Sequence, residues 1–152
     1  MDFFDVTTQH ILSKIIVAAF LGMCIVLERK FSHKEAGLRT FSLIALGCAL
    51  FVSLGNDFLV TTWGKSFIDP MRMVGQIIIG LGFLGAGLII FHKNKITGLT
   101  TAATMWVTAA IGSAVGLGAY AIAILATIVT LIVLVGGWKI EKSILDLSDT
   151  DK

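Results

Sequence analysis

The sequence has little charge. Only 14% of its 152 residues are charged and 56% are hydrophobic, whereas soluble domains carry about 25% charged residues. This composition excludes an ordinary soluble domain and predicts an integral membrane protein whose surroundings are the lipid bilayer. The net charge is only +2, so nucleic acid is not expected as a partner.

Cysteine and histidine are scarce and scattered. Cys24 and Cys48 lie in apolar segments, where small buried hydrophobic residues are expected rather than a disulfide or a metal site. His10, His33 and His92 fall at the ends of apolar segments or in loops, and each is expected to be an ordinary polar residue. No nucleophile stands beside a base. The sequence therefore predicts no enzyme activity, no metal and no cofactor.

Alternating segments of strand length are also missing, so a membrane β-barrel is not expected. A lipid-exposed backbone must satisfy its own hydrogen bonds, which favours an all-α bundle. Five membrane spans are predicted, at residues 6–27, 38–54, 71–91, 100–117 and 119–138. Residues 1–138 then form one transmembrane domain, and residues 139–152 form a short cytoplasmic tail.

The last two spans come from one uncharged stretch, residues 96–138. As a single helix it would be about 65 Å long, roughly twice the thickness of the hydrocarbon core. The stretch must therefore turn. The glycines in Gly116-Leu117-Gly118 make this the predicted break.

The lysines and arginines predict the orientation. Most of them fall in the first–second loop, the third–fourth loop and the tail, while Lys14, Lys65 and Arg72 fall on the opposite side. The positive-inside rule therefore predicts an N-terminus outside the cell and a C-terminus in the cytoplasm. Lys14 interrupts the first span near one end, where its long side chain is expected to extend to the headgroups.

Glycine, in contrast, is abundant in the predicted third span. The five glycines of its uncharged core are Gly75, Gly80, Gly82, Gly85 and Gly87. In membrane helices, small residues allow another helix to approach closely, and this is the favoured interpretation. The alternative is a broken helix that exposes backbone groups at a transport site. The pattern G-x-G-x-x-G at residues 80–85 lacks the strand and the acidic residue of a dinucleotide site, so we reject that interpretation.

The fourth span has its own small-residue motif. Gly112 and Gly116 form G-x-x-x-G, which fits either an internal contact or a contact between subunits of a homo-oligomer. Thr100 and Thr104 lie on one stripe of the same span. Their hydroxyls can bond to carbonyls of their own helix or to a neighbouring helix.

Further polar candidates lie at the ends of spans. Asp69 precedes the third span, where a negative charge interacts favourably with the positive end of the helix dipole and can pair with Arg72. Gln76 lies four residues after Arg72, on the same face of the helix. These three residues predict either a polar cluster facing the bundle or an interfacial charge pair. Glu28 and Arg39 flank the first loop, where they either pair or are solvated. No carboxylate is expected deep in any span.

Three groups of residues resemble the MgtC/SapB family of bacterial membrane proteins. They are Glu28-Arg29 with 36–40; 69–72 with Gln76-Ile77 and 80–87; and 97–106 with 109–112 and 116–118. Together they cover most of the chain, and the combination is more specific than any one glycine motif in it. The resemblance is to a short form, without the soluble C-terminal domain that some members carry.

This resemblance implies a multi-pass protein of the bacterial plasma membrane. Family members are associated with adaptation to low Mg²⁺ and, in some pathogens, with virulence. The better-supported family role is modulation of other membrane machines, including the F-type ATP synthase. We therefore expect a regulatory protein that contacts a membrane-protein partner. The alternative is a transporter or channel subunit whose third and fourth spans form a path.

Overall fold

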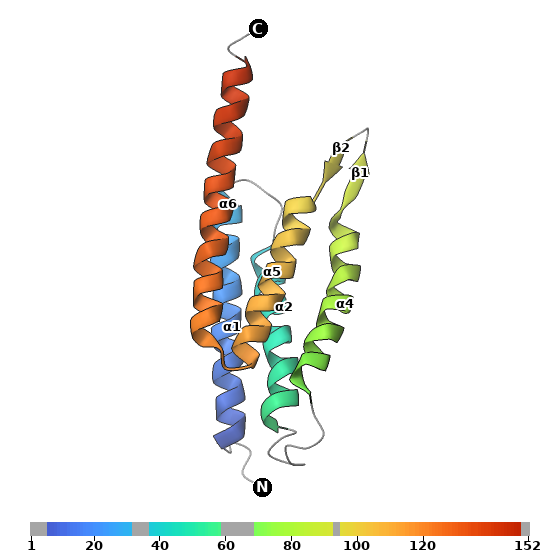
Figure 1. Ribbon diagram of the computed structural model, residues 1–152, viewed down its shortest axis with the longest axis vertical. Coiled ribbons are helices and arrows are strands. Elements are labelled where there is room, and N and C mark those ends of the chain that lie inside the picture. Colours follow the sequence, from blue (N-terminus) through green and yellow to red (C-terminus); the bar gives the residue numbers. More distant parts are fainter. Residues whose placement is uncertain (1–5, 32–36, 59–68, 93–94, 150–152) are drawn as a thin grey trace.

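A computed structural model describes residues 6–31, 37–58, 69–92 and 95–149 (Figure 1). These residues form a helical bundle with one short hairpin. The elements are α1 (Val6–Phe31), α2 (Leu38–Ser53), the π-helix η1 (Leu54–Phe58), α4 (Pro70–Leu88), β1 (Ile90–His92), β2 (Lys95–Thr97), α5 (Leu99–Gly116) and α6 (Tyr120–Asp149).

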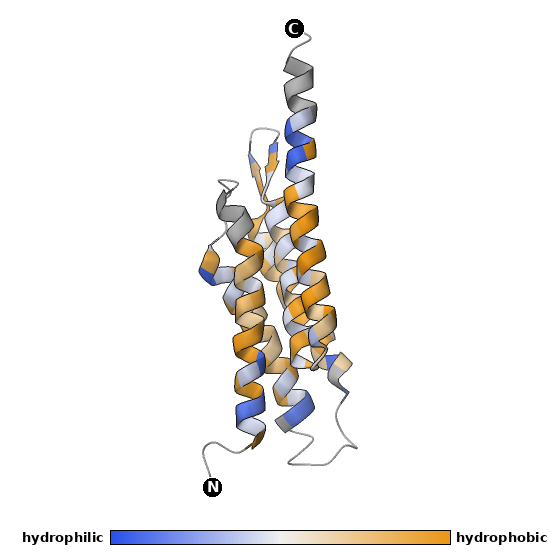
Figure 2. Cartoon of the chain, turned by 90° about the vertical axis from the view of Figure 1, so that its left-hand side faces the viewer, coloured by the Kyte–Doolittle hydropathy of each residue, from blue (hydrophilic) through white to orange (hydrophobic). Residues whose placement is uncertain are grey.

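Five of the helical segments are long and apolar enough to cross a membrane, which confirms the predicted bundle of five spans. They are Val6–Val26, Leu38–Asp57, Met71–Leu88, Leu99–Gly116 and Tyr120–Ser143. Hydrophobic residues cover the middle of the helices, and hydrophilic ones gather toward the ends (Figure 2). Successive helices run up and down, so that α1 begins at the lower end in Figure 1 and α6 ends at the upper end. Which end faces the cytoplasm stays a prediction.

Three helices form the centre of the bundle. α1, α2 and α5 all contact one another, while α4 lies mainly against α5, and α6 lies against α5 and α1. The largest fully buried side chains are at the centre and include Ile25, Phe41 and Ile111. A Cβ atom at Gly22 of α1 would lie 2.8 Å from the carbonyl oxygen of Phe41. Glycine therefore allows α1 to approach the backbone of α2.

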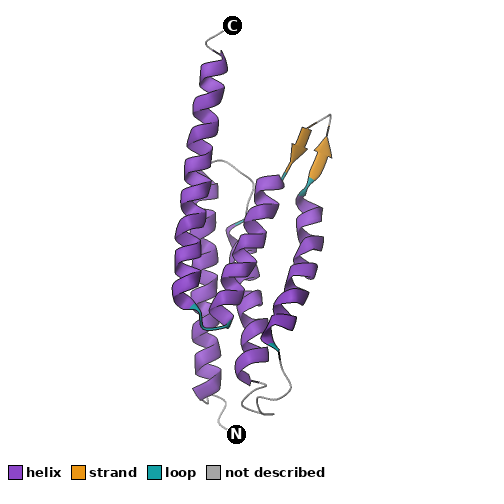
Figure 3. Ribbon diagram, in the orientation of Figure 1, coloured by secondary structure: helices purple, strands orange, loops and turns teal. Residues whose placement is uncertain are grey.

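The third span ends earlier than predicted. α4 stops at Leu88, and the next residues form β1, which pairs antiparallel with β2 so that Ile90 faces Thr97 (Figure 3). The prediction of helix to residue 91 and of a bundle without strands is wrong here. Gly98 follows β2 and precedes α5, and its φ is 86°. A Cβ atom at this position would collide with the carbonyl oxygen of Leu88. This left-handed conformation is one that glycine adopts without strain.

Two other boundaries differ from the prediction. The second span does not end at Leu54, because η1 continues it to Phe58. α6 continues through Asp149, so most of the predicted tail is helical. The break between the fourth and fifth spans is confirmed at residues 117–119, where Gly118 has a φ of 80°.

Candidate functional site

An ion pair lies inside the bundle, at the end where α2 meets η1. Lys14 on α1 is only 7% exposed. Its Nζ atom donates to Oδ2 of Asp57 in η1 at 2.5 Å and to the carbonyl oxygen of Gly116 in α5 at 2.9 Å. The prediction that Lys14 extends to the headgroups is wrong. Its side chain finds two oxygen acceptors between the helices, which compensate for the loss of water.

Neighbouring polar groups support both acceptors. Nδ2 of Asn56 donates to Oδ1 of Asp57 at 2.9 Å, and Oγ of the buried Ser53 donates to the carbonyl of Gly116 at 3.4 Å. Gly116 is the last residue of α5, so its carbonyl lies among those without a partner in the helix. The negative end of the helix dipole also favours a cation here.

Asp57 is the last residue of the span Leu38–Asp57 and its side chain is 22% exposed, so it is an acid at the end of a span. The sequence predicts the end of the second span at residue 54, but η1 carries the helix past Asp57. A π-helix is rare and is frequently found at functional sites. The spacing of Ser53 and Asp57, four residues apart, is the signal that could have revealed a continuing helix. Among the described residues, Lys14 and Asp57 form the only ion pair.

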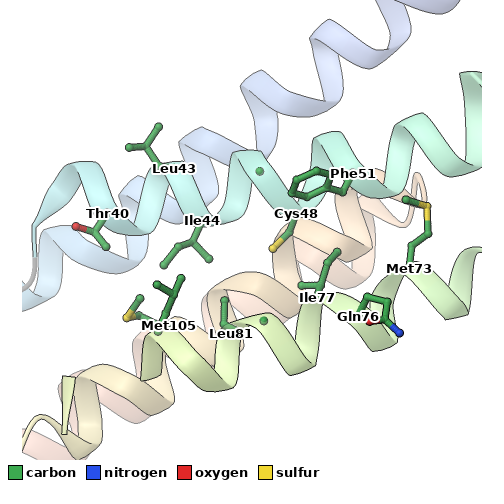
Figure 4. Close-up of a pocket in the computed structure, with 13 residues that line it drawn as sticks. Thr40, Leu43, Ile44, Cys48, Phe51, Met73, Gln76, Ile77, Leu81 and Met105 are labelled. Atoms are coloured by element: carbon green, nitrogen blue, oxygen red, sulfur yellow. The ribbon is translucent and has the colours of Figure 1, made fainter. Parts of the chain in front are cut away.

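An apolar groove opens on another side of the bundle. It lies between α2 and α4, has a volume of about 780 Å³, and reaches Met105 of α5 (Figure 4). Most of its lining is apolar and includes Ile44, Phe51 and Leu81. Gly55 of η1 abuts Met73 of the groove wall. η1 therefore contacts one residue of the groove wall through Gly55 and forms the ion pair through Asp57.

At the start of α4, the described residues show neither the predicted polar cluster nor a charge pair. Gln76 lines the groove, but Asp69 caps the helix by accepting a hydrogen bond from the backbone N–H of Met71 at 2.9 Å. Asp69 and Arg72 are both exposed, and the described residues hold no ion pair between them. An Asp cap followed by proline is a favourable helix start. Asp69 therefore stabilises the start of α4.

The glycines of α4 are open. The helix is continuous from Pro70 to Leu88, so the interpretation of a broken helix is wrong. A Cβ atom would meet no atom within 4 Å at four positions: Gly75, Gly80, Gly82 and Gly87. At Gly85 it would lie in ordinary contact, 3.8 Å from Cβ of Ala102. These glycines therefore allow no close helix contact within the described part of the chain.

The glycines of α5 behave differently. A Cβ atom at Gly112 would lie 2.8 Å from Cα of Ala45, and one at Gly116 would lie 2.9 Å from the carbonyl oxygen of Ala49. Of the two contacts that the motif left open, the internal one is therefore present, between α5 and α2.

The remaining candidates are local. Oγ1 of Thr104 donates to the carbonyl of Thr100 at 2.6 Å, and Oγ1 of Thr108 donates to that of Thr104 at 2.8 Å. These hydroxyls thus bond within their own helix, which is the first of the two alternatives. Arg39 is exposed at the start of α2, and the side chain of Glu28 lies outside the described residues. The described residues contain no group of three His, Cys, Asp or Glu able to hold a metal ion.

The fold and the site define a multi-pass helical membrane protein with an ion pair inside the bundle and an apolar groove on its side. The sequence pattern of the MgtC family matches residues 15–143. The chain belongs to the MgtC family, which confirms the resemblance seen in the sequence.

Three relatives illustrate the match. The chain is 40% identical over 129 residues to YhiD of Escherichia coli (strain K12), covering 84% of this chain and 60% of YhiD. It is 36% identical over 137 residues to SrpB of Synechococcus elongatus, covering 85% and 75%. It is 40% identical over 117 residues to MgtC of Salmonella typhimurium (strain LT2), covering 77% and 48%. The chain thus spans about half to three quarters of these relatives. No solved structure matches it significantly.

Proposed function

We propose that this chain is a regulatory protein of the bacterial plasma membrane, without enzyme activity, that binds another membrane protein through α4. Its physiological setting would be adaptation to low Mg²⁺. Family membership supports this setting, as does the full name of YhiD, which describes that relative provisionally as a magnesium transporter. The F-type ATP synthase is the candidate partner that the family role favours.

The observation that carries the proposal is the open glycine face of α4. Only 6% of the span Met71–Leu88 is buried. Exposed apolar side chains are expected on any lipid-facing helix, so exposure alone indicates nothing. Glycine is different, because it offers lipid no side chain but lets a second helix approach the backbone. Gly75 and Gly82 lie two turns apart, with open space above both. The face therefore suits a helix of a partner protein.

A photo-crosslinking residue tests this face. Ile79 lies on the same stripe as Gly75 and Gly82 and is 70% exposed. In native membranes, we expect a photoreactive residue at position 79 to form one discrete adduct with a membrane protein. The matched control is Ile132 of α6, which is 65% exposed and should form lipid adducts only. Mass spectrometry of the purified adducts identifies the partner.

A second variant separates specific contact from collision. Gly82→Leu fills the open space with a bulky side chain, so it should abolish the adduct from position 79 while leaving the chain folded. Equal protein adducts from positions 79 and 132, or an adduct that survives Gly82→Leu, would contradict the role of α4.

The second candidate function is a transporter or channel subunit. The buried ion pair of Lys14 and Asp57 favours it, because ionisable residues inside membrane bundles often mark ion pathways. The apolar lining of the groove favours the regulatory role instead. Flux of Mg²⁺ and of protons into liposomes containing the purified chain decides between the two. We expect no flux above that of empty liposomes, and robust flux would support the transporter.

A further inference from the structure

We propose that the hairpin of β1 and β2 binds anionic phospholipids at the membrane surface, with its apolar face against the acyl chains and Lys95 at the phosphates. The proposal rests on the exposed side chains of the hairpin and is independent of any partner of α4. The hairpin joins the ends of two membrane spans, since α4 ends at Leu88 and α5 begins at Leu99. This position is where the bilayer changes from hydrocarbon to headgroups.

The length of the hairpin matches the headgroup layer. α4 has 19 residues and is therefore about 28 Å long, close to the ~30 Å thickness of the hydrocarbon core. The hairpin continues upward from α4 and α5 (Figure 1). Three residues of a strand rise about 10 Å, which crosses a headgroup layer of roughly 5 to 8 Å on each side. The hydrocarbon boundary then lies near Ile90, and His92 and Lys95 lie at the level of the phosphates.

The two faces of the hairpin differ. The register pairs Phe91 with Ile96 and His92 with Lys95. Directly opposite residues share a face of a two-stranded sheet, and successive residues alternate between faces. Phe91 and Ile96 therefore form an apolar face, and they are 72% and 52% exposed. The polar pair lies on the other face with Ile90. At this depth, the apolar face meets the outer ends of acyl chains, as the apolar face of an interfacial helix does.

Charge complementarity favours an anionic surface. Lys95 is exposed, and no described residue forms an ion pair with it. The same end of the bundle carries further exposed basic residues, Arg39, Lys139 and Lys142. Glu141 is the one exposed acid among the side chains described at that end. An acidic protein could supply the complementary charge, but phospholipids surround the apolar face of the hairpin at its depth in any membrane. Anionic phospholipid therefore satisfies both faces.

Photo-crosslinking to lipids tests the proposal. Benzoylphenylalanine replaces Phe91 in the full chain, a change from one exposed aromatic side chain to another. The protein is reconstituted in nanodiscs that contain equal amounts of phosphatidylglycerol and phosphatidylcholine with the same acyl chains. Mass spectrometry of the adducts gives the ratio of the two lipids. We expect phosphatidylglycerol adducts to exceed phosphatidylcholine adducts, and high salt to lower the ratio because it screens exposed charges.

Variants at position 95 test the role of the ammonium. One lysine near an anionic surface is favoured roughly fivefold, so Lys95→Gln should lower the ratio by about that factor. Lys95→Arg keeps the charge and should keep the ratio. The matched control is Lys139→Gln, which removes the same charge at the same end of the bundle. It should leave the ratio unchanged, because α6 lies on the other side of the bundle from the hairpin (Figure 1).

Three results would overturn the proposal. One is a ratio that Lys95→Gln leaves unchanged, or that Lys139→Gln lowers equally. Another is the absence of lipid adducts from position 91. The third is a discrete protein adduct in place of lipid adducts when the same residue is activated in native membranes, because a protein would then cover the hairpin.

Discussion

Replacing Asp57 by asparagine should lower the free energy of unfolding by about 3 kcal/mol, because it leaves the Lys14 ammonium buried without a countercharge. The Lys14 side chain is 7% exposed, and its other acceptor is the carbonyl of Gly116. The ammonium therefore cannot be hydrated unless the lysine side chain moves out of the bundle. Unfolding of the purified chain in mixed detergent micelles measures the loss. The control is Lys142→Ala on α6, whose exposed ammonium lies 5.7 Å from the ring centroid of Trp138. That change should alter stability by less than about 0.5 kcal/mol.

A double replacement distinguishes the ion pair from simple packing. Lys14→Met with Asp57→Asn removes both charges and keeps similar volumes, so most of the lost stability should return. A double variant as unstable as the single one would show that the loss does not come from the unpaired charge.

The second large effect is expected at the contact between α5 and α2. Gly112→Ala should lower the free energy of unfolding by about 2 kcal/mol, because overfilled packing costs about 1 to 3 kcal/mol. The new Cβ atom would lie 2.8 Å from Cα of Ala45. That obstacle is backbone, which cannot rotate away as a side chain can. α5 must then move from α2, and it carries Gly116 and the carbonyl that holds Lys14 with it.

Gly82→Ala is the matched control, since the substitution is identical and the residue also lies in a membrane helix. Its Cβ atom meets nothing within 4 Å, so stability should change by no more than about 1 kcal/mol. The same unfolding assay measures both variants. A loss at position 82 as large as that at position 112 would contradict the packing described for α5.

The number of spans could be predicted because its signals are local. Each span is a continuous apolar run, and the turn after α5 needs a glycine with positive φ, which Gly118 provides. The hairpin could not be predicted, because the apolar residues Ile90 and Phe91 continue the apolar sequence of α4 without a break. In sequence, two apolar residues at the start of a strand look like a continuation of the helix.

The site depends on pairs of residues far apart in the chain. Lys14 and Asp57 look like two isolated charges near the ends of spans, and only folding brings them together. The surroundings of the glycines also depend on the fold. Gly112 and Gly82 both belong to small-residue motifs, yet one contacts the backbone of α2 and the other faces open space. A motif indicates that a helix can approach closely, but only the packing of the whole bundle decides where one does.

The buried lysine also has a consequence for biosynthesis. Asp57 follows Lys14 by 43 residues, and Gly116 follows it by 102. At a synthesis rate of about 5 to 20 residues per second, the first helix exists for about 5 to 20 seconds before the ribosome reaches its second acceptor. Until Asp57 has been made, its ammonium must stay in water or at the headgroups, since a bare charge in the hydrocarbon core is unfavourable. Both contacts of Lys14 can therefore form only after the fourth span has been made.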